Sequence, residues 1–94
     1  MNAKDLTLNI AVNMGRLSRW AMEGKTSRIE QFIDETQDYL ENLDKAPKSE
    51  KFTHTLHAFK NKFRELKENK NYDKFWAEDA LTWANILTHR AKLA

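Results

Sequence analysis

Apolar side chains recur at spacings of three and four residues along almost the whole chain, which is the period of a helix with one buried face. No stretch alternates between apolar and polar residues over the length of a strand. Only two glycines and one proline occur in 94 residues, so few positions interrupt a helix. The sequence therefore predicts an all-α protein.

Four amphipathic segments follow from this spacing, and together they account for a single domain over residues 1–94. We expect helices over residues 3–23, 28–44, 49–69 and 74–92. The apolar stripes expected to form the core are Ala3, Leu6, Ile10, Met14, Leu17 and Ala21, then Ile29, Phe32, Ile33, Thr36, Leu40 and Leu43, then Phe52, Leu56, Phe59, Phe63 and Leu66, and finally Trp76, Ala80, Trp83, Leu87 and Ala91.

Residues with known preferences for helix ends support these boundaries. Gly24 is suited to a left-handed position after the first helix, and Pro47 ends the second. Ser27 and Glu30 have the spacing of a capping box at the start of the second helix, and Asp73 is a suitable N-cap for the fourth. The connections are therefore short.

Helices of roughly equal length joined by short turns must run antiparallel to their neighbours in sequence. Each predicted helix is roughly 17 to 21 residues, or about 25 to 30 Å at 1.5 Å per residue. This predicts an antiparallel up-down-up-down four-helix bundle. The alternative is a pair of helical hairpins that complete their core only by dimerising.

Composition excludes several classes of function. The absence of cysteine rules out disulfides, thiolate metal sites and cysteine nucleophiles. The longest uncharged stretch, Leu6 to Gly15, is much shorter than the roughly 20 apolar residues of a membrane-spanning helix. Asp5 stands where a signal peptide would carry basic residues. We expect a cytoplasmic protein that does not engage a membrane.

No catalytic motif is present: the sequence lacks a nucleophile elbow, a phosphate-binding loop, a dinucleotide fingerprint and paired inward carboxylates. We therefore predict a protein that is not an enzyme, with no cofactor and no small-molecule substrate. Asp79 is the one acid near an apolar stripe, and a site near Asp79 and Arg90 is the least favoured hypothesis. We expect Asp79 to bond to another helix instead, with Asn13 as a candidate partner.

Glu50, His54 and His57 share one helix face at spacings of four and three residues, and such side chains can bind a transition metal. The face is predicted to be exposed, no fourth ligand is evident, and the chain contains no Glu-x-x-His motif of the kind found in di-iron bundles. We expect solvated histidines and no metal site.

Charge is unevenly distributed although the net charge is only +2. Residues 28–44 carry six acids and one arginine, whereas residues 45–74 carry nine bases and four acids. We expect ion pairs between the second and third helices. The alternative function is a small subunit of a nucleoprotein complex that binds the nucleic-acid backbone. The residues predicted for that alternative are Lys60, Arg64, Lys67, Lys70 and Lys74.

The least ordinary feature is the outer face of the first helix, which lacks the polar character of a surface helix. It carries three small residues at spacings of four and three, which would leave a groove where another helix can approach closely. Such residues can also be incidental, since single exposed apolar side chains are normal. We predict a protein-interaction module that forms a homodimer or docks on another protein through this face. The residues predicted for the interaction are Leu8, Ala11, Val12, Gly15, Ser18 and Met22.

Overall fold

The computed structural model describes all residues from 1 to 94 and consists of four long helices without a strand. The prediction of an all-α fold is confirmed. Each helix boundary lies within two residues of the predicted one. The helices are α1 (Ala3–Met22), α2 (Ile29–Lys45), α3 (Glu50–Glu68) and α4 (Lys74–Arg90), with short 3-10 helices η1 (Thr26–Arg28) before α2 and η2 (Ala91–Leu93) after α4.

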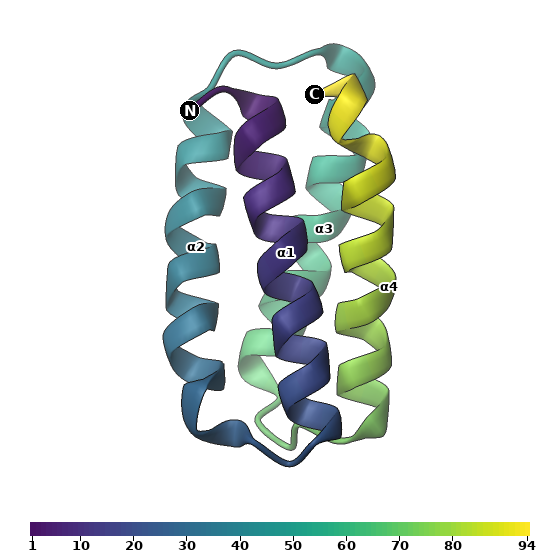
Figure 1. Cartoon of the computed structure of the whole chain (residues 1–94). Helices are drawn as coiled ribbons and strands as arrows, with labels where there is room; N and C mark the ends of the chain where they lie inside the picture. The colour runs from purple at the N-terminus through teal and green to yellow at the C-terminus, as the bar shows by residue number, and fades with distance from the viewer.

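The four helices run alternately up and down, as predicted, and form a bundle with extents of 37 × 20 × 19 Å. In Figure 1, α1 lies in front, between α2 and α4, and α3 lies behind it. Both chain ends are at the same end of the bundle (Figure 1). The outer face of α1 is therefore the surface farthest from α3.

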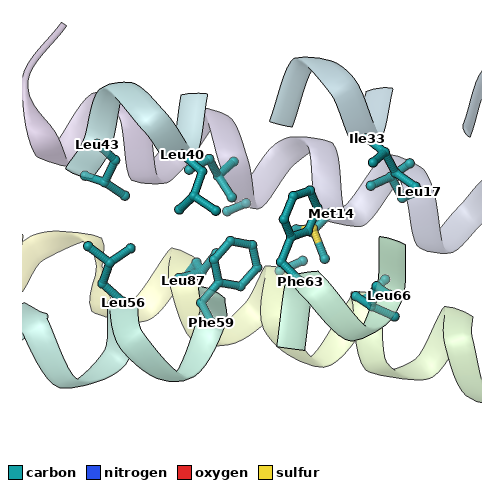
Figure 2. Packing of buried hydrophobic residues seen from close by; sticks show 14 of the residues in the cluster. Met14, Leu17, Ile33, Leu40, Leu43, Leu56, Phe59, Phe63, Leu66 and Leu87 are labelled. Carbon is teal, nitrogen blue, oxygen red and sulfur yellow. The ribbon is translucent and has the colours of Figure 1, made fainter. Parts of the chain in front are cut away.

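The core is one continuous apolar cluster that all four helices line. Nearly every predicted stripe residue is buried. The exceptions, Phe32 and Trp83, are half-buried and pack against the edge of the cluster. Figure 2 shows Phe59 and Phe63 of α3 reaching into the centre of the bundle. None of the four helices is both long and apolar enough to cross a membrane.

Small side chains bring α1 and α4 close together. Ala77, Ala80 and Ala84 of α4 are buried, and Ala77 and Ala80 have no exposed surface at all. The Ser18 hydroxyl of α1 donates a hydrogen bond of 2.7 Å to the Ala77 carbonyl of α4. A side chain as short as serine reaches a backbone atom of another helix only when the two helices lie close together, so α1 and α4 form a tight contact.

Most helix ends are capped as their residues predict. Gly24 adopts a φ of +71° after α1, and the Asp73 side chain accepts a hydrogen bond of 2.9 Å from the Trp76 amide at the start of α4. The expected capping box of Ser27 and Glu30 was wrong. Ser27 lies inside η1, whose turn begins the helical path one residue earlier, and no side chain caps the start of α2.

The end of α2 has a cap that sequence inspection did not identify. The Lys48 ammonium donates to three backbone carbonyls, those of Leu43, Asp44 and Ala46, over 2.9–3.0 Å. A cation is favoured at this position because the last carbonyls of a helix carry partial negative charge and lack partners within the helix. Lys48 thereby fixes the turn that leads from α2 into α3.

Candidate protein-interaction surface

Four of the six residues predicted for protein interaction lie on the outward side of α1. Val12 is 52% exposed and Met22 is 62% exposed, whereas Leu8 and Gly15 are partly exposed. Spacings of three, four and seven residues place them along one line of the helix. We call Leu8, Val12, Gly15 and Met22 the outer strip of α1.

The other two predicted residues, Ala11 and Ser18, are not part of this surface. They are only 4% and 2% exposed, and the Ser18 hydroxyl bonds to the Ala77 carbonyl of α4. The groove that these small residues were expected to leave for a partner is filled by the alanines of α4. The expectation for Ala11 and Ser18 is corrected accordingly: they are contacts within the bundle.

Gly15 has no packing role inside the chain. A Cβ atom built at Gly15 would have no side chain or other helix within 4 Å. Glycine in the middle of a helix is less favourable than alanine by roughly 0.5–1 kcal/mol, because it leaves the unfolded backbone more freedom. Nothing within the bundle offsets this cost.

Replacing Gly15 with alanine is therefore expected to raise the free energy of unfolding of the single chain by about 0.5–1 kcal/mol. The measurement is urea denaturation followed by circular dichroism at a low protein concentration. Gly24→Ala is the matched control. It should lower stability, because Gly24 has a positive φ that alanine does not readily adopt. A loss of stability in Gly15→Ala would show that the bundle needs a glycine there.

An apolar residue of α4 extends this surface. Leu81 is 45% exposed and lies one turn from both Ala77 and Ala84, the residues that face α1. It therefore lies on the side of α4 nearest α1. Sequence analysis missed Leu81, because the stripe assigned to α4 gave no sign of how close the two helices would lie.

The basic side chains predicted beside α3 are largely engaged with α2. Lys60 forms an ion pair of 3.0 Å with Asp44, and Lys70 forms one of 3.0 Å with Glu30. The Lys67 ammonium donates a hydrogen bond of 2.7 Å to Gln37 of α2. The expected ion pairing between the two helices is confirmed for Lys60 and Asp44, whereas Lys70 follows the end of α3 and Lys67 bonds to the uncharged Gln37.

These pairs bear on the alternative of nucleic-acid binding. The hydrogen bond from Lys70 to Glu30 raises the pKa of the Lys70 ammonium, and the two charged groups are 3.0 Å apart at the surface. A phosphate would have to displace Asp44 and Glu30 from their lysines. Arg64 bonds only to Asn61 of its own helix and, like Lys74, is exposed.

Asp79 bonds to another helix, as expected, although its partner is Lys62 of α3 rather than Asn13. The two groups are 3.3 Å apart at the surface. A hydrogen bond to Glu65 is the largest cause of a raised pKa at Lys62. Partial burial lowers that pKa less strongly, and Asp79 raises it further. Asn13 lies on the α2 side of α1 and donates a hydrogen bond of 3.1 Å to Glu35.

Glu50, His54 and His57 are all exposed, and no group of three acidic, histidine or cysteine side chains lies close enough to hold a metal ion. The largest surface pocket, about 410 Å³, lies between the start of α1 and the end of α2. Its lining residues include Lys45, Tyr39 and the amino-terminal residue Met1.

An aromatic and arginine cluster at one end of the bundle was also not predicted. Trp20 and Phe32 meet edge to face with ring centres 4.9 Å apart, and the Arg28 guanidinium lies 5.3 and 5.2 Å from the two ring centres. Such contacts stabilise a surface while keeping the charge in water. Trp20 and Phe32 are half-buried because they pack against the edge of the core. With Arg28 they hold the connection between α1 and α2 in place.

No protein-family model, curated protein or solved structure matches the chain.

Proposed function

We propose that the protein is a non-enzymatic interaction module that binds a protein partner through the outer strip of α1. The observation that carries this proposal is that Val12 and Met22 stay exposed, and Leu8 and Gly15 partly exposed, after the four helices have closed their core. A helix that faces only water is polar on its outer side. Exposed apolar residues that adjoin one another, unlike scattered single ones, mark contact with another macromolecule.

The glycine in the strip supports the same proposal. Helices pack with their axes about 8–10 Å apart depending on the side chains between them, so a residue without a side chain permits a close approach. At Gly15 no part of the bundle uses that space. A helix of a partner would use it, and the contact would offset the cost of glycine at this position.

The ionisable side chains also favour binding over catalysis. Lys60, Lys62 and Lys70 are each bonded to a carboxylate at the surface, where they link neighbouring helices. A catalytic acid or base is characteristically held in a cleft with a pKa adjusted to its task. These three lysines are arranged as structural pairs.

Val12→Glu is expected to abolish association through the outer strip, because it places a charge at the centre of an apolar contact. The helix itself should persist, since Val12 is exposed and glutamate favours helix more than valine does. The measurements are the mass in solution by light scattering and the recovery of crosslinked partners from the native cell. Both are compared with those of the unmodified protein.

Thr53→Glu is the matched control, because it replaces another exposed β-branched residue with glutamate on α3, away from α1. It should leave both measurements unchanged. If Val12→Glu behaves like Thr53→Glu in both, with its helix content intact, the proposed function is wrong.

A further inference from the structure

Two charged residues of α1 share the spacing of the outer strip: Asp5 comes three residues before Leu8, and Arg19 lies within the strip, between Gly15 and Met22. Asp5, Leu8, Val12, Gly15 and Arg19 follow one another at intervals of three, four, three and four residues. This is the heptad spacing that lets two helices meet along a seam. The seam is apolar in its centre, with an acid at one end and a base at the other.

The two terminal charges have no partner within the chain. Neither the Asp5 carboxylate nor the Arg19 guanidinium takes part in an ion pair, and both residues are exposed. Arg16, the other arginine of α1, behaves differently. It donates a hydrogen bond of 3.4 Å to Asn13 and lies over the Phe32 ring. Asp5 and Arg19 are therefore available for a contact outside the bundle.

The seam is complementary to itself when it is reversed. Asp5 and Arg19 each lie seven residues from Val12, about 10.5 Å along the helix axis. An antiparallel copy of the helix centred on Val12 thus places Asp5 opposite Arg19. The large Leu8 then lies within one residue, about 1.5 Å along the axis, of the position opposite the bare backbone of Gly15. A twofold axis repeats both contacts, as a symmetric dimer requires.

A parallel copy lacks this complementarity. It would place Asp5 against Asp5, Arg19 against Arg19 and Gly15 against Gly15, with like charges at both ends and a gap between. Like charges that face each other across an interface disfavour association. The charge pattern therefore selects one orientation.

We propose that the partner of the outer strip of α1 is a second copy of this chain, bound antiparallel about a twofold axis at Val12, with Asp5 of each copy against Arg19 of the other. This inference rests on the proposed function and specifies its partner. The contact of one helix with one helix is smaller than the roughly 800 Å² per partner of a standard interface. The dimer is therefore a weak one that forms at micromolar concentrations or above.

The test is sedimentation equilibrium over a range of protein concentrations on the unmodified chain, Asp5→Arg, Arg19→Asp and the double variant. Each single reversal creates two like-charge contacts and should weaken the dimer about tenfold or more. The double variant restores opposite charges and should dimerise within about threefold of the unmodified chain. Circular dichroism checks that all four proteins keep their helix content.

Mixing the two single variants gives a further readout. In a mixed dimer, one copy has a base at both ends of its seam and the other copy has an acid at both ends. Both terminal contacts between the unlike copies then join opposite charges. The mixture should therefore dimerise more strongly than either variant alone. Single variants that dimerise like the unmodified chain would overturn the antiparallel arrangement.

The result for the unmodified chain separates this inference from the proposed function. One possible result is a monomer at every concentration together with a crosslinked partner that is lost in Val12→Glu. This result would overturn the proposal that the partner is a second copy, but the proposed binding through the outer strip would stand. A dimer that Val12→Glu leaves intact would overturn the second copy as the partner of the strip, and it would overturn the proposed function as well if the crosslinked partners were also unchanged. A dimer lost in Val12→Glu and rescued by the double charge reversal is the expected result.

Discussion

Phe59→Ala is expected to lower the free energy of unfolding by about 3–5 kcal/mol, the usual range for removing a buried phenylalanine side chain. Phe59 has no exposed surface. Its ring is stacked on Phe63 with centres 5.5 Å apart and is tilted against Trp83 of α4 at 5.7 Å. Figure 2 shows it in the middle of the cluster, near Leu87. Its removal leaves a cavity that these neighbours cannot fill without moving.

Urea denaturation followed by circular dichroism measures this loss. Phe75→Ala is the matched control, because Phe75 is 72% exposed on α4 and the same atoms are removed. Its effect should stay within about 0.5 kcal/mol. If the two variants were equally stable, the packing of α3 through its phenylalanines would be refuted.

Ala77→Leu is expected to lower stability by about 1–3 kcal/mol for the opposite reason, because it adds volume where none is free. Ala77 is fully buried, and the hydrogen bond from Ser18 to its carbonyl shows how near α1 lies. A leucine there must push α4 away from α1. That displacement would break the Ser18 bond and loosen the alanine contacts on either side.

The measurement is thermal unfolding together with the amide exchange rates of α1 and α4. Glu78→Leu supplies the control, since it introduces the same side chain at the adjacent, exposed position. It should cost much less stability. A neutral Ala77→Leu would mean that α1 and α4 do not approach closely.

The sequence was sufficient for the fold because each helix carries an unambiguous stripe. In α3, the spacing of Phe52, Phe59 and Phe63 selected the buried face directly, and all three are buried. Gly24 and Asp73 marked helix ends through local backbone and hydrogen-bond preferences that do not depend on the rest of the fold. Patterns of this kind can be recognised from the sequence of a single helix, without knowing which helices it packs against.

The distance between helices was not visible in this way. A helical wheel assigned Ala11 and Ser18 to the outer face because they lie about a quarter turn from the centre of the α1 stripe. Burial extends that far only because α4 offers alanines to them. A comparison of the two helices would have found the signal, since small residues recur at a spacing of seven on α1 (Ala11, Ser18) and on α4 (Ala77, Ala84).

Pair partners were predicted only in part for a similar reason. Opposite charges on the second and third segments identified the helices that pair, as Lys60 and Asp44 show. The partners of Asp79 and Asn13 depended on which side of its helix each residue occupies relative to two neighbours. That information comes from the assembled bundle.

The close contact of α1 with α4 also bears on the entropy of binding. Alanine and serine have few or no rotamers to lose, so the contact between α1 and α4 through Ala11, Ser18 and the alanines of α4 costs little side-chain entropy. Binding on the outer side then needs little further ordering of the helix backbone. The small residues that exclude a partner from one side of α1 thus preorganise the other side, which lowers the entropic cost of association.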